Sequence, residues 1–437
     1  MTSPDKLLST KMEDNSEQKE PLLFLCHRIP FPPNKGDKIR SFNILKKLSE
    51  QYDIHLGCFI DDPFDKQYVS GLHKYCSSIF HLDQNKTRAK IKGLTGFLTN
   101  KPITLPYYFD KSMQQWTNRT IAQEHIEKVF IYSSSMAQYV QGNNDEGETY
   151  NSLERVIDFV DVDSDKWRQY SNKKSGVAKW FFNREYKLLA REENKICEQF
   201  THSLFVSPDE ASLFRDNQPK TQQNKVHGLL NGVDVHFFNP EATFSEESLV
   251  PNAPFISFTG AMDYWANIDA VLWFSAEVWP LIVAKQPDAI FCIVGGNPSN
   301  EVKALAKNNT GIVVTGRVHD VRPFIDQAQC VVAPLQIARG IQNKVLEAMS
   351  LNKPIVLTTM AMEGINAQKT DSIVITDDRS VYADACLAFL EKQPTNTTNR
   401  EWILDNFTWQ QTLQPLMSYF SNKFAKPVNS EKQKEKH

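Results

Sequence analysis

The stretch RGIQNKVLEAMSLNKPIV, Arg339–Val356, decides the fold. Its apolar residues recur at helical spacing, and a proline then opens the strand-like run PIVLTT at Pro354–Thr359. A short helix that leads directly into an apolar strand is the repeating unit of parallel α/β domains. The stretch therefore predicts a parallel sheet with helices packed against it.

The same alternation of apolar runs and helical patterns continues along the chain. We expect strands in the first half at residues 21–27, 53–60, 78–83, 128–134, 155–161 and 203–207. We expect strands in the second half at residues 254–260, 289–296, 311–316, 330–335, 354–359 and 372–376. The predicted fold class is α/β, with two Rossmann-like domains that face each other across a cleft.

The domain boundaries follow from length and composition. A chain of 437 residues is longer than one core usually supports, and the polar segment Asn239–Pro254, with three prolines, separates the two halves. We expect a disordered tail at 1–20, an N-terminal domain at 21–240, a linker at 241–253, a C-terminal domain at 254–405, a C-terminal helix at 406–425 that packs back on the N-terminal domain, and a disordered tail at 426–437.

The bulk composition favours a cytoplasmic protein without a nucleic-acid partner. The 49 basic and 52 acidic residues leave a net charge of -3, so any anion site must be local. Seven cysteines lie scattered without a C-x-x-C pair, which favours buried thiols over a disulfide or zinc framework. The first twenty residues lack the apolar stretch of a signal peptide, and no uncharged run is long enough to cross a bilayer.

Lys344 and Glu347 are the first candidates for a ligand site. They lie three residues apart, so they share one face of a helix that we expect to begin near Gly340. Ligands of open α/β sheets bind beyond the carboxyl ends of strands, where helix N-termini favour phosphate. A lysine beside a diphosphate and a glutamate that accepts hydrogen bonds from ribose hydroxyls would fit a nucleotide. The alternative is a surface ion pair.

The loop after the first strand is a second candidate. Within His27–Leu48, Gly36 permits close backbone approach, Asp37 suits a helix N-cap, and Lys38 and Arg40 add positive charge. These four residues could form a substrate or anion site at a helix N-terminus. The alternative is an ordinary strand-to-helix turn with a solvated basic edge.

Asp161 and Asp163 follow another predicted strand, within Asp158–Trp167. Alternating aspartates can ligate calcium, but the segment has no glycine at the sixth position and no glutamate at the twelfth. We therefore expect no metal. Helix capping explains at least one of these aspartates, and the sharper hypothesis places a carboxylate in the cleft.

The tract Asn85–Phe109 interleaves lysine and arginine with apolar and aromatic residues. A basic amphipathic segment of this kind can lie on an anionic membrane surface. The alternative is an ordinary solvated helix and loop.

Several segments together resemble retaining nucleotide-sugar glycosyltransferases with the GT-B fold, of the group 1 or family 4 type. NKVLEAMSLNKPIV looks like their glutamate-alanine-methionine helix with its proline-led strand, and LLNGVDVHFFNP at Leu229–Pro240 matches the element that closes their N-terminal domain. The segments that begin at Ile256 and Val314 follow in the family's order. The resemblance covers about residues 21–420 and is closest to sugar transferases of bacterial exopolysaccharide export systems.

The resemblance assigns roles residue by residue. Glu347 matches the second of two family glutamates and would bind the ribose, whereas Arg339 stands where the first glutamate is expected. Gly340 is retained, but Gln342 replaces the second glycine of the family loop. Asp161 or Asp163 stands where the family often has a histidine.

Two sets of site residues follow from the motifs and the resemblance. The family's donor-phosphate arginine and lysine are absent from Gly260–Asn267, so Arg317, Arg339 and Lys344 are the expected replacements. The expected donor-binding residues are Glu347, Gly340, Asn343, Arg317, Gly260 and Asn267. The expected catalytic residues are Asp161, Asp163, Arg339 and Lys344.

The implied activity is transfer of a sugar, of the hexosyl type, from a nucleoside diphosphate to an acceptor hydroxyl with retention. The implied partners are the donor and a lipid-linked glycan acceptor at the cytoplasmic face of the membrane, with no cofactor and no metal. Three alternatives stay open: a nucleotide-sugar epimerase, a dinucleotide oxidoreductase, and a non-catalytic sugar-nucleotide-binding protein. The oxidoreductase is the weakest, because no G-x-G-x-x-G follows any predicted strand.

Overall fold

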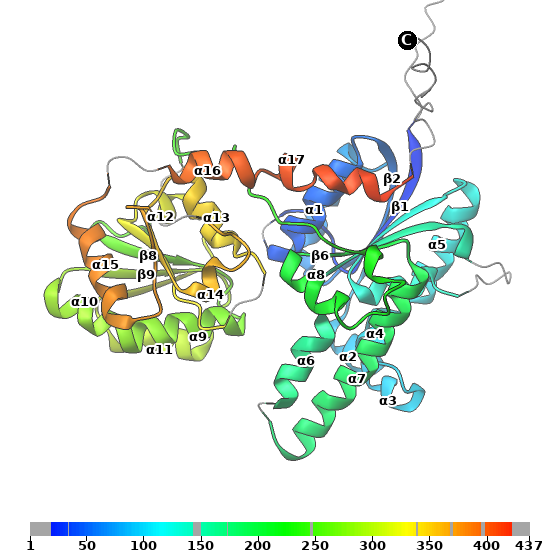
Figure 1. Cartoon of the computed structure of the whole chain (residues 1–437), viewed down its shortest axis with the longest axis horizontal. Helices are drawn as coiled ribbons and strands as arrows, with labels where there is room; N and C mark the ends of the chain where they lie inside the picture. The colour runs from blue at the N-terminus through cyan, green and yellow to red at the C-terminus, as the bar shows by residue number, and fades with distance from the viewer. Residues whose placement is uncertain are drawn as a thin grey trace, which may run out of the picture.

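Two α/β domains make up the computed structural model of this chain, and an extended helical segment runs from one to the other (Figure 1). The structure describes residues 19–33, 35–142, 150–172, 174–244, 248–337, 340–367, 370–394 and 398–421. The predicted fold class is confirmed, because each domain is built on a parallel sheet with helices around it. Most of the predicted N-terminal tail and the whole of the predicted C-terminal tail lie outside the described residues.

The N-terminal domain contains a seven-stranded parallel sheet in the order β3-β2-β1-β4-β5-β6-β7. Its strands are β1 Glu20–Cys26, β2 Tyr52–Ile60, β3 Ser78–Asp83, β4 Lys128–Tyr132, β5 Glu154–Val160, β6 His202–Phe205 and β7 Val226–Gly228. Apolar clusters cover both faces, as the near-continuous apolar runs of these strands require. The strand order reverses between β1 and β4, so a ligand site is expected at their carboxyl ends.

The helices of this domain place two loops of interest. They are α1 Gly36–Leu48, α2 Lys86–Leu94, α3 Gly96–Thr99, α4 Thr104–Tyr108, α5 Lys111–Gln123, α6 Asp163–Asn172, α7 Gly176–Gln199 and α8 Pro208–Arg215. The loop before α1 follows β1, and the loop before α6 follows β5. Figure 1 shows α6 and α7 as a hairpin that projects away from the sheet, with α3 beside α7.

The C-terminal domain contains a six-stranded parallel sheet in the order β10-β9-β8-β11-β12-β13. Its strands are β8 Phe255–Thr259, β9 Ile290–Val294, β10 Ile312–Gly316, β11 Cys330–Ala333, β12 Ile355–Leu357 and β13 Ile373–Ile375. Its helices are α9 Trp265–Trp273, α10 Trp279–Lys285, α11 Asn300–Asn308, α12 Arg322–Asp326, α13 Asn343–Ser350, α14 Thr359–Met362 and α15 Arg379–Glu391. The strand order reverses between β8 and β11, which again puts a ligand site at their carboxyl ends.

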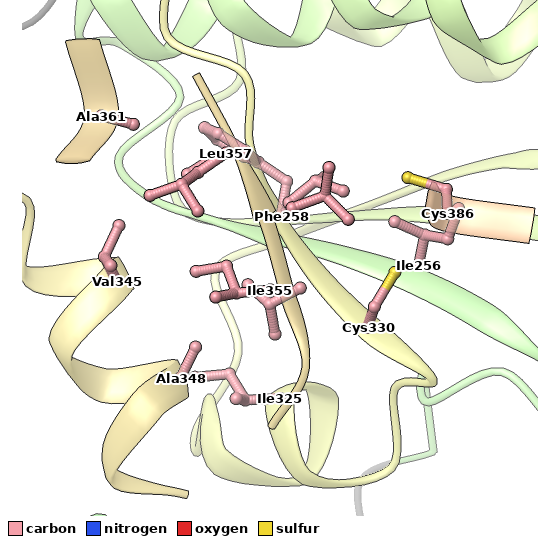
Figure 2. Packing of buried hydrophobic residues seen from close by; sticks show 14 of the residues in the cluster. Ile256, Phe258, Ile325, Cys330, Val345, Ala348, Ile355, Leu357, Ala361 and Cys386 are labelled. Carbon is pink, nitrogen blue, oxygen red and sulfur yellow. The ribbon is translucent and has the colours of Figure 1, made fainter. Parts of the chain in front are cut away.

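Helix α13 is held by the apolar residues that its sequence pattern singles out. Val345 and Ala348 are fully buried, and Figure 2 shows them directed toward Ile355 and Leu357 of β12. The helix begins at Asn343, three residues after the predicted start at Gly340, because Gln342 still has an extended backbone. Lys344 and Glu347 lie on the opposite, partly exposed side of the helix.

One helical run combines α9, the π-helical turn Phe274–Val278 and α10. Among the described residues, this run, Trp265–Lys285, is long and apolar enough to cross a membrane by length and composition. Its inner side, including Ala270, Phe274 and Ile282, is fully buried in the C-terminal core. The hydropathy of this run is therefore accounted for by packing on the sheet.

The chain crosses between the domains twice, and the two crossings touch. Val233 forms a parallel bridge with Thr408, and a β-carbon on Gly232 would lie 2.6 Å from the backbone nitrogen of Trp409. Val233 and Phe238 pack in the C-terminal core, so the first domain ends before the predicted boundary at residue 240. The two crossings form a narrow connection between the domains.

The last described segment returns to the first domain. Helix α16, Asn399–Asn406, lies on the C-terminal domain, whereas α17, Trp409–Thr412, and the 3₁₀ turn Gln414–Tyr419 lie over the N-terminal domain (Figure 1). Leu413, Leu416 and Phe420 are buried in the same cluster as β1 and β2. In place of the predicted single helix at 406–425, the described residues of this segment form the short helix α17 and a 3₁₀ turn, since Pro415 limits helix continuation.

Candidate functional site

Lys344, Asn267 and Gly260 form one connected group beside α13. The Lys344 ammonium donates a hydrogen bond of 2.9 Å to the Asn267 carboxamide oxygen. The Asn267 amide nitrogen in turn donates to the carbonyl oxygen of Ala261 at 2.9 Å. A β-carbon on Gly260 would lie 2.6 Å from that amide nitrogen, so only glycine lets Asn267 approach the loop after β8. The structure therefore brings together three residues that the sequence analysis proposed for donor binding.

Burial shifts the pKa values of Lys344 and Glu347 toward neutrality. Desolvation lowers the pKa of Lys344 to about 8, although the Glu347 carboxylate opposes this effect. Desolvation raises the pKa of Glu347 to about 7, although the Lys344 ammonium opposes it. The two groups do not form a contact ion pair, and Glu347 has no hydrogen-bond partner among the described residues. Lys344 and Glu347 therefore do not form the surface ion pair that was the alternative, and none of the residues described here occupies the Glu347 carboxylate.

The loops after β9 and β10 extend this group. Gly295 adopts φ +158°, and a β-carbon there would lie 1.7 Å from the Gly260 carbonyl oxygen, so the loops after β8 and β9 touch backbone to backbone. Arg317, just after β10, is exposed and lies beside Gly296. Arg317 has no ion-pair or hydrogen-bond partner among the described residues. An exposed cation thus lies at the same end of the sheet as Lys344.

Gly340 lies where the two domains meet. Its φ of +63° is in the left-handed region that favours glycine. A β-carbon there would lie 2.8 Å from the Val206 Cγ1 atom and 3.9 Å from the Asp161 Oδ1 atom, both in the N-terminal domain. Gly340 therefore permits the loop before α13 to approach the carboxyl ends of β5 and β6.

Asp161 and Asp163 flank one lysine at the start of α6. The Lys166 ammonium donates to the Asp161 Oδ2 atom at 2.7 Å and to the Asp163 Oδ1 atom at 3.1 Å. Burial lowers the pKa of Lys166, but the two carboxylates outweigh this effect and hold it well above its usual range. Tyr264 of the C-terminal domain lies within electrostatic range of Lys166 and Asp161. The predicted carboxylates therefore lie at the domain interface, joined by a cation.

Two buried glutamates hold the backbone that carries these aspartates. The Val162 amide donates to the Glu210 Oε2 atom at 2.9 Å. The Ser164 amide and hydroxyl both donate to the Glu193 carboxylate, at 3.0 and 2.5 Å. Burial raises the pKa of Glu193 to about 8. Sequence reasoning missed both glutamates, because they lie on α7 and α8, far along the chain from β5.

The turn before this segment is strained. Val160 has φ +70°, which is unfavourable for a β-branched residue, and the sheet register shifts there. The Val160 amide donates to the Asp158 Oδ1 atom at 2.9 Å, which holds the turn. Strain of this kind concentrates at functional sites, and here it directs Asp161 toward Gly340.

The loop after β1 is built differently from the prediction. The helix N-cap is Lys35 rather than Asp37, which lies one residue inside α1 and accepts a hydrogen bond from Arg28 at 2.5 Å. Gly36 is exposed, and no atom would lie within 4 Å of a β-carbon there. The nearby His27 ring stacks on Tyr132 at 5.8 Å, and burial lowers its pKa. His27 therefore lies partly buried in the loop after β1, and the sequence analysis did not name it as a candidate.

Lys38 and Arg40 are not free cations, which corrects their assignment to a substrate loop. Lys38 is buried against Asp65 at 2.5 Å. Arg40 is buried against Asp158 at 2.8 Å and also donates to the Asn231 carboxamide oxygen at 2.9 Å. Both side chains are only 1% exposed, so neither can contact an acceptor substrate.

Arg40 instead links the first domain to α13 through Asn231. Asn231, which accepts its hydrogen bond, donates to the Asn343 carboxamide oxygen at 3.3 Å. The predicted donor-binding residue Asn343 is therefore hydrogen-bonded to Asn231, which lies on the first crossing between the domains. Arg339 lies outside the described residues.

The described residues contain no group of three or more histidine, cysteine, aspartate or glutamate side chains arranged to hold a metal ion. Lys344 and Arg317 are cations at the carboxyl end of the C-terminal sheet, whereas Lys166 is already paired with Asp161 and Asp163. Cations in this position suit a ligand that carries phosphate.

Comparison with known proteins agrees with this geometry. Residues 253–392 match the family model for glycosyl transferases group 1. An uncharacterized 44.6 kDa protein in the cps region of Klebsiella pneumoniae is 21% identical over 370 residues, which cover 81% of this chain and 87% of that protein.

Solved structures share the arrangement of both domains. A glycosyltransferase from Rickettsia africae has a TM-score of 0.56 and 14% identity, over 92% of this chain and 98% of that one. Anabaena HepE, solved in complex with UDP and glucose, has a TM-score of 0.61 and 13% identity, over 91% of this chain and 98% of that one. The chain thus has the two-domain GT-B fold of these solved structures, and residues 253–392 of its C-terminal domain resemble the group 1 glycosyl transferases.

Proposed function

We propose that this protein is a retaining hexosyltransferase that moves a sugar from a nucleoside diphosphate to an acceptor hydroxyl. The observation that carries the proposal is the side of α13 that faces away from the core. There Lys344 is held by Asn267 at 2.9 Å, and the Glu347 carboxylate has no hydrogen-bond or ion-pair partner within the described part of the chain. A cation for the diphosphate and an acceptor for ribose hydroxyls lie one helical turn apart.

In this mechanism the chain's own cations stabilise the leaving diphosphate. Negative charge develops on the diphosphate as the bond to the sugar breaks, and Lys344, Arg317 and the N-terminus of α13 lie at the sheet end where it would be held. The proposal requires no metal and no cofactor, because these groups supply the positive charge. The proposal also includes Arg339, next to Gly340 in the sequence, as a further cation for the diphosphate.

Asp161 and Asp163 act on the acceptor side. Asp161 lies opposite Gly340, and Lys166 holds its carboxylate in place. We assign Asp161 and Asp163 to orienting the acceptor hydroxyl and accepting its proton as the new glycosidic bond forms. Contact between the two domains would exclude the water that otherwise consumes the donor.

The biological setting is proposed from the relatives. The Klebsiella pneumoniae relative is named for its cps region, which supports a role in exopolysaccharide or other surface-glycan synthesis. Because HepE was solved with UDP and glucose, a uridine nucleotide sugar is the first donor to test. A lipid-linked glycan at the cytoplasmic face of the membrane is the proposed acceptor.

The deciding experiment has two stages. A thermal-shift screen of nucleoside diphosphates and their sugars identifies the donor, since a bound ligand raises the melting temperature. Turnover with lipid-linked acceptors then follows, with Glu347→Ala and Asp161→Asn as variants and Lys303→Ala, on exposed α11, as the control. The product is examined by proton NMR for retention. Donor interconversion without acceptor would show an epimerase, and donor binding without any turnover would show a binding protein.

A further inference from the structure

Six of the large apolar side chains that the structure leaves exposed gather on one surface of the N-terminal domain. The surface is made by α2 and α3 together with the start of α7, which lies about 80 residues further along the chain. We call it the apolar tip, and it consists of Ile91, Leu94, Phe97, Leu98, Val177 and Trp180. Leu98 is 89% exposed and Val177 82% exposed, so these side chains contribute nothing to the core.

Direct contacts hold the two parts of the apolar tip together. The Phe97 ring lies 6.4 Å from the Trp180 ring, and the Arg184 guanidinium lies 4.3 Å from the Phe97 ring centroid. Arg184 also donates to the Gly96 carbonyl oxygen at 2.7 Å, and the Ile103 amide donates to the Glu185 carboxylate at 2.9 Å. The packing that fixes α3 against α7 therefore leaves Leu98 and Val177 almost fully exposed.

Positive charge surrounds the apolar tip. No acidic residue occurs between Asp83 and Asp110. Five exposed basic side chains of the two segments have no acidic partner among the described residues: Arg88, Lys90, Lys101, Lys174 and Lys179. Acidic groups of this region are already engaged, since Glu185 is buried and paired with Arg184. The surface thus combines unpaired positive charge with exposed apolar side chains.

We infer that the apolar tip is the surface by which this protein docks on a bilayer that contains anionic phospholipid. Lysine and arginine would meet the headgroups, while Leu98, Val177 and Trp180 would enter the boundary between headgroups and acyl chains. A soluble polyanion would complement the positive charge but would leave the apolar side chains exposed. An apolar protein surface would cover the apolar side chains but would leave the positive charge unpaired. The inference deepens the proposed function, because it places the acceptor side of the enzyme beside a membrane.

The test measures cosedimentation of the full-length protein with vesicles. Vesicles of phosphatidylcholine with phosphatidylglycerol are compared with vesicles of phosphatidylcholine alone. The expected result is binding to the anionic vesicles only, weakened by salt because the charges are at the surface. Binding to neither kind of vesicle overturns the inference.

Variants locate the surface. Leu98→Ser with Trp180→Ser should weaken vesicle binding at least about ten-fold. Lys90→Gln, Lys101→Gln and Lys179→Gln should weaken it by up to about five-fold for each residue. The matched controls are Val381→Ser on α15 and Lys303→Gln with Lys307→Gln on α11, all exposed and in the other domain, which should bind as the wild type does. Undiminished binding by the Leu98 and Trp180 variant overturns the inference.

Two further measurements separate this inference from its rivals. If the wild type forms dimers in solution, and Leu98→Ser abolishes them without changing vesicle binding, the tip is a self-association surface and the inference fails. The thermal shift given by nucleotide sugar in the absence of lipid should be the same in the tip variants and the wild type. A wild type that binds anionic vesicles but no nucleotide sugar would refute the proposed function and leave the docking surface intact.

Discussion

Lys344 and Glu347 lie one turn apart on α13, and burial brings their pKa values to about 8 and about 7. Ribose hydroxyls need the ionised Glu347 carboxylate, so donor affinity should fall as the pH drops below 7. The diphosphate needs the charged Lys344 ammonium, so affinity should also fall as the pH rises above 8. Titration with UDP-glucose, whose phosphates do not titrate in this range, should give maximum affinity between these values. In the Glu347→Gln variant, the fall in donor affinity below pH 7 should disappear, and the fall above pH 8 should remain.

Replacing Lys344 by methionine should separate donor binding from stability. The folded protein disfavours the charged ammonium, because the pKa of Lys344 falls from 10.5 to about 8. Below pH 8 the charge therefore costs stability, and Lys344→Met should keep or raise the free energy of unfolding by about 1 kcal/mol, after allowance for partial exposure. Donor affinity should fall at least about ten-fold with the loss of a charge-assisted contact. Urea unfolding and calorimetric titration measure the two effects, and a large loss of stability would contradict the prediction.

Glu193 should make the stability of the protein depend on pH. Its pKa is raised from 4.5 to about 8 by burial, so the folded state favours the protonated form. The stabilisation is complete below pH 4.5 and is lost as the pH rises through 8. Glu193→Gln mimics the protonated carboxyl and should be the more stable protein at pH 8. Melting curves from pH 5 to 9 measure the difference, and Glu192→Gln, its partly exposed neighbour, serves as the control. Parallel curves for wild type and Glu193→Gln would refute the prediction.

Gly340→Ala should hinder the approach of the two domains. The added β-carbon would lie 2.8 Å from the Val206 Cγ1 atom, and φ +63° adds strain of roughly 1 kcal/mol. Turnover should therefore fall more than donor affinity. Gly316→Ala is the matched control, because Gly316 has φ +72° but no atom within 4 Å of its β-carbon position. Val206→Ala removes the clashing methyl group and should restore part of the lost activity in the double variant.

Asp158→Asn should destabilise the N-terminal domain strongly. Arg40 and Asp158 are 1% and 0% exposed, so the variant leaves a buried guanidinium without its counter-charge. Such a change costs about 3–5 kcal/mol. The comparison variant is Asp83→Asn, which removes an exposed pair with Lys66 and should cost less than about 1 kcal/mol. Equal effects of the two variants in urea unfolding would contradict the structural role of Arg40.

The strands were predictable because parallel strands buried on both faces appear as short apolar runs. The group on α13 was predictable for a related reason: Lys344 and Glu347 are close in sequence and lie opposite Val345 and Ala348, which are buried. The prediction that Lys38 and Arg40 line a substrate loop was wrong because their ion-pair partners are distant in sequence. Asp65 is 27 residues from Lys38, and Asp158 is 118 residues from Arg40, so local sequence gave no sign of their burial.

The positioning of Asp161 shows the same limit. Its place on the chain, directly after a strand, was sufficient to nominate it. Its surroundings depend on Glu193, Glu210 and Val206. These residues are distant in sequence, and only the order of the strands in the sheet brings them near Asp161. Lys166 was within reach of sequence reasoning, since it follows Asp163 by three residues at the start of a helix.

The return of the chain to its first domain has a consequence for how the protein is made. Leu413, Leu416 and Phe420 complete the core around β1 and β2, and the Ser421 amide donates to the Glu154 carboxylate at 2.8 Å. The ribosome makes these residues only after the whole second domain. The first domain therefore cannot finish its core until the second domain has been made, and a chain that stops short of residue 413 would leave the apolar surface around β1 and β2 uncovered. The first domain thus depends, for its final packing, on a segment that is synthesised only after the second domain.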